Sequence, residues 1–250
     1  MERIIQETKE KIIYQVDDKV LKTYSTNYNL SQVLNEALNQ SRVYEAGVST
    51  ARVYEVKKYN GRTAIEMDYI EGKLLSDYLT ENEKEKDKYI ELFASIHHEL
   101  MNTSIVNLNN SYGRIKNKIF NSELAATTKY ALFYKLKKME FSYDTIHGDY
   151  NLSNVIISKE GKTYIIDWSH VSFGDRKFDI ATTYAIFVVE DKEDIGNIYL
   201  DKICELEKID KQYIFDKLIF AYIYIVDRYN KNIQDKIYDK MYDIIKDEEV

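Results

Sequence analysis

The sequence predicts an α+β fold in which a small antiparallel sheet with one helix precedes a larger, mostly helical part. Three observations support this: short β-branched runs within the first seventy residues, long stretches with helical periodicity after residue 85, and one β-hairpin among those helices. Runs of strands followed by runs of helices are typical of α+β proteins. Within the 250 residues we expect an N-terminal lobe over residues 1–70 and a C-terminal lobe over residues 71–250.

The N-terminal lobe is expected to contain five short strands, because apolar and β-branched residues recur in runs that end at polar turns. These runs cover residues 4–6, 11–16, 20–24, 52–57 and 63–69. From Leu30 to Glu45, apolar residues follow the spacing of an amphipathic helix, with Asn29 or Ser31 as its start signal. The first seventy residues therefore predict a small sheet and one helix.

The C-terminal lobe is predicted to be mostly helical. Apolar residues share one face from Glu85 to Met101, and we expect His97 in this helix to be structural and hydrogen-bonded. Within the lobe, the β-branched runs 155–158 and 163–166 flank a turn at Gly161 and predict a β-hairpin. Further helices are expected at residues 122–140, 183–190, 193–207 and 211–247.

Composition argues against several classes of function. The net charge is −7 and the isoelectric point is near 5.3, whereas nucleic-acid binding requires a basic face, so no nucleic-acid partner is expected. No apolar run approaches the roughly eighteen residues of a membrane span, and the N-terminus lacks a signal peptide's apolar core. We therefore expect a cytoplasmic protein without a membrane partner. The single cysteine, Cys204, rules out an internal disulfide framework.

The most informative stretch runs from Thr145 to Trp168 and places two carboxylates and one amide at intervals suited to phosphoryl transfer. Asp149 is the candidate for the carboxylate that accepts the proton of an acceptor hydroxyl. Asn154 and Asp167 supply the oxygen ligands that Mg²⁺ prefers. Asn154 and Asp167 lie thirteen positions apart. The expected hairpin brings its two ends together, so both residues can face one metal site.

This stretch also carries a family resemblance. The pattern His-Gly-Asp, four residues, Asn and then Ile-Asp-Trp begins at His147 and resembles that of the aminoglycoside phosphotransferase and choline kinase family. Residues 173–181 are similar to a Gly-Asp segment that follows in the same family, and the resemblance extends to about residue 187. It implies a two-lobed protein-kinase-like fold. It also implies transfer of the γ-phosphoryl group of ATP or GTP, with Mg²⁺, to a hydroxyl of a small molecule.

The resemblance assigns further residues to the nucleotide. Lys22 corresponds to the lysine on the third strand that pairs with the α- and β-phosphates. Glu36 corresponds to the helix glutamate that holds this lysine, with Glu45 as the fallback. The main chains of Asp68 and Ile70 match the hinge that contacts adenine.

Two other features concern the loops of the site. The resemblance makes His147 and Asp179 structural supports of the catalytic loop. The family's nucleotide loop usually contains a glycine, which lets the backbone approach the phosphates, but residues 7–10 contain none. This departure puts the phosphate contact of that loop in doubt, with Thr8 and Lys9 as the groups that could replace it.

Three hypotheses about the function stay open, and two of them differ in the acceptor. An acidic surplus after residue 189, which includes Glu190 and Asp191, favours a cationic acceptor such as an aminoglycoside, although such a charge run is also typical of a solvated helix start. The second hypothesis is a kinase of choline, ethanolamine or another small metabolite. The third is a nucleotide-binding or structural protein without turnover, which the glycine-free loop suggests.

Overall fold

The computed structural model describes residues 2–139 and 142–248, and its contacts divide the chain into two compact units. The first unit comprises residues 1–81, 105–107 and 152–171, and the second comprises residues 82–104, 108–151 and 172–250. Helices and antiparallel strands are both present, so the predicted α+β class is confirmed. The lobe boundary expected near residue 70 stays a prediction. By contacts the hairpin groups with the first unit, because its strand β8 pairs with a strand of that unit.

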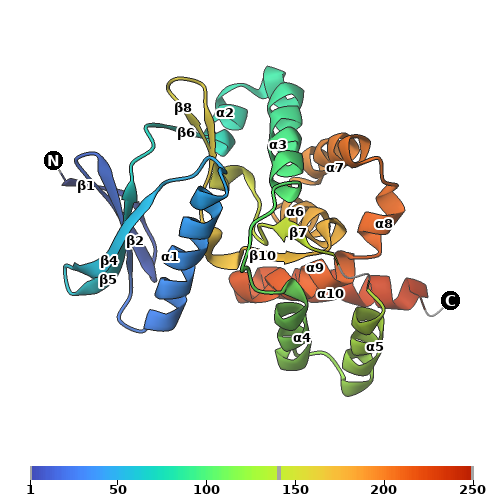
Figure 1. Ribbon diagram of the computed structural model, residues 1–250. Coiled ribbons are helices and arrows are strands. Elements are labelled where there is room, and N and C mark those ends of the chain that lie inside the picture. The colour runs from blue at the N-terminus through green and yellow to red at the C-terminus, as the bar shows by residue number, and fades with distance from the viewer. Residues whose placement is uncertain (1, 140–141, 249–250) are drawn as a thin grey trace. The chain divides into compact units, whose positions relative to one another are not determined.

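The first unit contains an antiparallel sheet of five strands in the order β1-β2-β3-β5-β4. Helix α1 packs against β4 and β5 of this sheet, as Figure 1 shows at the blue end of the chain. Buried Tyr24, Val33 and Ile65 form the core between them. The elements of this sheet and its helix are β1 (Glu2–Glu7), β2 (Lys11–Val16), β3 (Lys19–Tyr24), α1 (Leu30–Glu45), β4 (Val53–Tyr59) and β5 (Arg62–Asp68).

A second sheet of three strands in the first unit carries the expected hairpin. Its order is β6-β8-β9, and Val155 of β8 lies opposite Ile165 of β9. The Ile166 amide donates to the Asn154 carbonyl at 2.9 Å, so the two ends of the hairpin meet as predicted. The remaining elements of this unit are β6 (Gly72–Leu74), helix α2 (Leu75–Glu81), β8 (Val155–Ser158), β9 (Thr163–Ile165) and the 3₁₀ turns η2 (Leu152–Asn154) and η3 (Trp168–His170).

Over its described residues, the second unit contains helices and one short strand pair, β7 with β10. Helix α3 packs on α7, and α6 packs on both α7 and α9. All of α6 after its first two residues is buried, so this helix lies at the core of the unit. Its elements are η1 (Glu83–Glu85), α3 (Lys86–Met101), α4 (Ser111–Asn121), α5 (Ala126–Lys137), β7 (Asp144–Ile146), β10 (Ser172–Gly174), α6 (Arg176–Val189), α7 (Glu193–Glu207), α8 (Lys211–Phe215), α9 (Leu218–Ile225), η4 (Val226–Arg228) and α10 (Lys231–Glu248).

Three helices differ from the prediction, and local capping explains two of the differences. The helix expected over residues 122–140 is wrong in extent: α4 ends at Asn121 and α5 starts at Ala126, while residue 140 lies outside the described residues. The Asn110 side chain accepts from the Tyr112 amide and starts α4, which the sequence analysis missed. Asp175 caps α6 in the same way, so this helix begins at Arg176, seven residues before the expected start. The single helix expected over residues 211–247 is divided into α8, α9 and α10.

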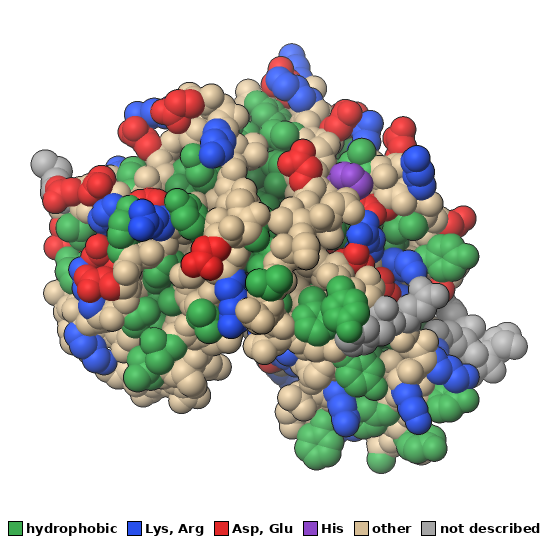
Figure 2. Space-filling model, in the orientation of Figure 1, with side chains coloured by type: hydrophobic (Ala, Val, Ile, Leu, Met, Phe, Trp, Pro, Cys, Tyr) green, Lys and Arg blue, Asp and Glu red, His purple; other side chains and the backbone are tan. Residues whose placement is uncertain are grey.

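Charged side chains of both signs are interspersed over the visible face of the molecule (Figure 2). Large apolar side chains are also exposed on α4 and α5, among them Phe120 and Tyr130. Among the described residues, no helix combines the length and the apolar character that a membrane span needs.

Candidate active site

In the first unit, one lysine contacts two carboxylates. Lys22 Nζ lies 2.6 Å from Glu36 Oε1 and 3.1 Å from Asp167 Oδ2. The Lys22 and Glu36 side chains are 8% and 2% exposed, so this ion pair is almost fully removed from water. Burial alone lowers the pKa of a lysine, but the carboxylates of Asp167 and Glu36 outweigh it and raise the pKa of Lys22 above its ordinary value. Lys22 is therefore held as a cation.

Local structure explains why these groups meet. Lys22 lies on β3 directly opposite Ile13 of β2 and Ile65 of β5, so its side chain shares their face of the sheet. Glu36 lies at the middle of α1, on the buried face that includes Val33. The fallback, Glu45, is exposed at the end of the same helix.

Asp167 follows β9 in a left-handed backbone conformation, with φ at +64°. This conformation is unfavourable for residues with a side chain and is often found at functional sites. The Ser169 hydroxyl donates to Asp167 Oδ1 at 2.9 Å, and the Trp168 indole donates to the Thr50 hydroxyl at 2.8 Å. Burial opposes ionisation of Asp167, but Lys22 and Lys11 hold its pKa well below the ordinary value.

The donor set beside Asp167 fits a magnesium ion. The main chains of Asn154 and Ile166 are joined by a hydrogen bond, so the Asn154 amide and the Asp167 carboxylate extend from adjacent ends of one hairpin. Mg²⁺ binds oxygen ligands and usually takes one or two carboxylates, with nucleotide phosphates supplying further oxygens. The assignment of Asn154 and Asp167 as metal ligands stays a prediction.

In the second unit, Asp179 holds the loop that carries Asp149. The amides of His147 and Gly148 donate to the two carboxylate oxygens of Asp179, each at 2.8 Å. His97 Nε2 lies 3.0 Å from Asp179 Oδ2, and its Nδ1 lies 2.7 Å from the Tyr199 hydroxyl. Burial would raise the pKa of Asp179, but the hydrogen bond from His97 and the charges and amides of the loop lower it. Asp179 is thus a buried anchor for the backbone before Asp149.

A residue that the sequence analysis missed contacts Asp149 directly. Arg228 in η4 donates from Nη1 to Asp149 Oδ1 at 2.6 Å and from Nη2 to the Gly148 carbonyl at 2.8 Å. Its guanidinium also lies 4.9 Å from the centre of the Tyr224 ring. The only sequence signal is an arginine at the end of the apolar run 218–226. No spacing rule links such a residue to one seventy-nine positions earlier.

The hinge residues lie at the end of β5. The Asp68 carboxylate accepts from the Tyr54 hydroxyl at 2.7 Å and from the Arg52 amide at 3.2 Å. The Asp68 amide itself donates to the Arg52 carbonyl at 3.1 Å, so this N–H is already paired. Ile70 follows in irregular chain before β6. Adenine contacts at Asp68 and Ile70 stay predictions.

The two candidate acceptor residues lie at the end of α6. Glu190 is the C-cap of that helix, and its carboxylate pairs with Lys192 at 2.8 Å. Asp191 pairs across to Lys236 of α10 at 3.4 Å. Burial, followed by the charges of Glu190 and Asp149, raises the pKa of Tyr229. Glu190 and Asp149 therefore both lie near Tyr229.

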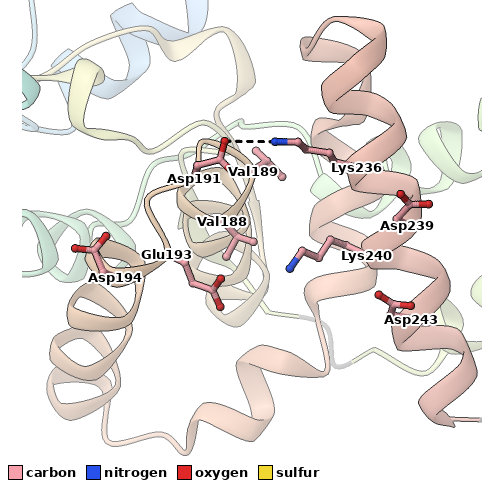
Figure 3. A pocket seen from close by; sticks show the side chains of 9 residues that line it. All are labelled: Val188, Val189, Asp191, Glu193, Asp194, Lys236, Asp239, Lys240 and Asp243. Atoms are coloured by element: carbon pink, nitrogen blue, oxygen red, sulfur yellow. Dashed lines mark hydrogen bonds and ion pairs between the residues drawn. The ribbon is translucent and has the colours of Figure 1, made fainter.

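Asp191 also lines a surface pocket of about 590 Å³ between α6, α7 and α10 (Figure 3). Five acids and two lysines line it, which gives a net charge of −3. One of these acids, Asp194, is paired with Lys86 at 3.0 Å. The lining residues are Val188, Val189, Asp191, Glu193, Asp194, Lys236, Asp239, Lys240 and Asp243.

Several solved structures share the fold of the chain. A choline/ethanolamine kinase family protein from Mesorhizobium loti matches with a TM-score of 0.67 at 12% identity, over 98% of this chain and 88% of that one. A thermostable mutant of aminoglycoside phosphotransferase APH(4)-Ia, in ternary complex with ADP and hygromycin B, matches with a TM-score of 0.70 at 14% identity, over 98% and 93%. Choline kinase LicA from Streptococcus pneumoniae matches with a TM-score of 0.64 at 15% identity, over 97% and 92%. The predicted kinase-like fold is confirmed.

No curated protein matches the sequence. The family model described as "Phosphotransferase enzyme family" matches residues 7–208, which include every candidate residue named from Lys22 to Asp191. The family resemblance noted in the sequence is thereby confirmed. The chain belongs to the phosphotransferase enzyme family.

Proposed function

We propose that the protein transfers the γ-phosphoryl group of ATP or GTP to a hydroxyl group of a small cationic molecule. The observation that carries this proposal is the double contact of Lys22 with Glu36 and Asp167. A buried lysine held between two carboxylates is a fixed cation, and phosphoryl transfer depends mainly on such fixed charges around the phosphates. Binding of ADP in a similar structure supports the use of a nucleotide.

Each of the central residues has a definable role. Asn154 and Asp167 would hold Mg²⁺, which when bound neutralises charge on the β- and γ-phosphate oxygens. Lys22 binds phosphate oxygens, and Glu36 keeps its ammonium in place. Asp149 accepts the proton of the acceptor hydroxyl, while Arg228 fixes its carboxylate through Oδ1.

Loop geometry supports the role of Asp149. The backbone just before it is fixed by two amide hydrogen bonds to Asp179, and Gly148 adopts a positive φ of 75° that the turn requires. A carboxylate on a fixed loop needs little reorganisation before it accepts a proton. We assign His147 and Asp179 the role of supporting this loop. We assign the main chains of Asp68 and Ile70 the role of binding adenine.

The acceptor that we favour is an aminoglycoside, because carboxylates gather beside the catalytic loop of the second unit. Glu190 and Asp149 share Tyr229 as a neighbour, and the adjoining pocket carries a net charge of −3. Cationic ligands are attracted to surfaces of this sign. Choline or ethanolamine is the alternative acceptor, which the similarity to two choline kinase structures favours.

A coupled assay of ADP formation, run with Mg-ATP and Mg-GTP against a panel of acceptors, tests the proposal. The panel contains aminoglycosides, choline, ethanolamine and neutral sugars, with Asp149→Asn as the control for background hydrolysis. We expect turnover with an aminoglycoside that Asp149→Asn abolishes. Turnover with neutral sugars alone would exclude the cationic acceptor, and nucleotide binding without any turnover would favour a non-catalytic member of the fold.

A further inference from the structure

A second lysine of the first unit approaches the same carboxylate as Lys22. Lys11 Nζ lies 3.9 Å from Asp167 Oδ2, while Lys22 Nζ lies 3.1 Å from that oxygen. The Lys11 side chain is 24% exposed, so its ammonium is neither buried in the core nor free in solvent. The family resemblance assigns a partner glutamate to Lys22 but none to Lys11.

Strand register explains why the two lysines converge. Lys11 lies opposite Tyr24, and Ile13 lies opposite Lys22, so Lys11 and Lys22 are diagonal neighbours on one face of the sheet. Diagonal neighbours of this kind are within reach of long side chains. The Lys11 ammonium also lies 5.7 Å from the ring centre of Tyr24 and 6.0 Å from that of Tyr28. Contacts of a cation with two aromatic faces restrict where the ammonium can go.

The turn before Lys11 is poorly suited to bind phosphate through its backbone. The Thr8 amide donates to the Lys11 carbonyl at 2.8 Å, and the Lys11 amide donates to the Thr8 hydroxyl at 3.0 Å. These bonds close a tight turn and engage two of its N–H groups. Glu7 and Glu10 also place carboxylates in the turn, and these repel phosphate. The glycine-free turn therefore lacks the open run of amides that a phosphate loop offers.

We propose that Lys11 binds the phosphates of the nucleotide together with Lys22, in place of the backbone of a glycine loop. The inference deepens the proposed function and rests on it. Two ammonium groups on one face of the sheet balance the carboxylates of Glu36 and Asp167 and place N–H donors next to the oxygen ligands of the candidate metal site. Lysine is well suited to this role because it binds phosphate as a point charge without strict geometry.

A competing explanation is that Lys11 only compensates the charge of Asp167. The two explanations differ when Asp167 is made neutral and no metal is present. A direct phosphate ligand still strengthens nucleotide binding in an Asp167→Asn background. A residue that only compensates the charge of Asp167 has nothing left to compensate there, so its replacement no longer changes nucleotide binding.

Calorimetric titration of the full chain with AMP-PNP and with adenosine, each in EDTA and in both the wild-type and the Asp167→Asn background, separates these explanations. We expect Lys11→Met to weaken AMP-PNP binding about tenfold, as for loss of a partly exposed charge-assisted hydrogen bond, and to leave adenosine binding unchanged. Lys11→Arg, which keeps the charge, should restore most of the affinity. Salt should weaken AMP-PNP binding less in Lys11→Met than in the wild type, because one attractive charge is gone.

Lys58→Ala is the matched control, because Lys58 is an exposed lysine of the same sheet whose ammonium bonds the Thr63 hydroxyl. If Lys11→Met has a lower melting temperature than the wild type in the absence of ligand, the same titrations are made with Lys11→Gln, which keeps a polar side chain. Equal AMP-PNP affinity with and without the Lys11→Met change in EDTA, in the wild-type or in the Asp167→Asn background, would overturn the inference alone. If Lys9→Ala weakened AMP-PNP binding as much as Lys11→Met does, the inference would also be overturned, because the turn rather than Lys11 would then account for the phosphate contact. Failure of the wild type to bind AMP-PNP both in EDTA and with Mg²⁺ would overturn the proposed function as well.

Discussion

Asp167 and Asp179 are both ionised carboxylates in this protein, but the two units hold them by different means. Asp167 is 27% exposed and is surrounded by the ammonium groups of Lys22 and Lys11. Asp179 is fully buried and is bound by two backbone amides and an imidazole. Charges on long side chains can exchange partners when a ligand arrives, whereas backbone amides cannot move away. The first arrangement therefore suits ligand binding, and the second suits a permanent structural anchor.

The largest effect that we expect is on turnover. Asp149→Asn should lower kcat by about 10²-fold or more, because a positioned general base typically contributes that much. The melting temperature should change little, since Arg228 keeps its bond to the Gly148 carbonyl and Asp179 keeps the loop in place. Steady-state kinetics on the true acceptor, with melting curves of both proteins, test this. Near-normal kcat in the variant would remove Asp149 from its role.

The next effect should be on the folded state. Asp179→Ala leaves two buried loop amides without an acceptor and should cost about 3 kcal/mol of unfolding free energy. Asp167→Ala should cost less, but it should abolish the stabilisation by Mg-nucleotide that the wild type shows. Chemical denaturation with and without Mg-AMP-PNP measures both quantities. If Asp179→Ala were as stable as Asp167→Ala, the anchor role of Asp179 would have to be given up.

Lys22 and Glu36 should act as one unit in both stability and turnover. Lys22→Met leaves the carboxylate of Glu36 buried with its cation missing and should destabilise the protein by about 3 kcal/mol. Adding Glu36→Leu should recover part of that loss, and the double variant should turn over no worse than the poorer single one. Strictly additive losses in both stability and turnover would indicate that the two residues act separately, and Glu45 should then be tested.

The pH dependence of stability should distinguish the amide-held carboxylate. The pKa of Asp179 is lowered from 3.8 in the folded protein, so its contribution is complete above that value and is lost as the pH falls below it. We expect the stability advantage of the wild type over Asp179→Asn to be constant near neutral pH and to shrink below about pH 4. Urea denaturation of both proteins between pH 3 and pH 7 measures it. An advantage that persists unchanged to pH 3 would contradict the lowered pKa.

The comparison also explains what the sequence could predict. The hairpin and its two ends follow from local patterns: β-branched runs, a glycine turn and the positions of Asn154 and Asp167. The pairing of Lys22 with Glu36 needs a family resemblance, because helix periodicity alone does not choose between Glu36 and Glu45. Arg228 could not be predicted, since its contact with Asp149 depends on how α9 packs on α6. Lys11 was missed for a related reason: the pairing register of β2 and β3 determines which face it shares with Lys22.

The smallest effect should be at the acceptor. Glu190 and Asp191 are 38% and 79% exposed, so their attraction for a cation is screened by salt over roughly 8 Å at physiological ionic strength. The paired change Glu190→Gln and Asp191→Asn should raise the KM of a cationic acceptor about threefold, the size expected for exposed charge pairs, and should leave the nucleotide KM unchanged. The wild-type acceptor KM should also rise with salt, and the variant should respond less. Asp201→Asn, an exposed acid on α7 outside the pocket, is the matched control. If the acceptor KM ignored both salt and the paired change, these carboxylates would be ordinary solvated charges, and Asp149 would have to recognise its acceptor through other groups.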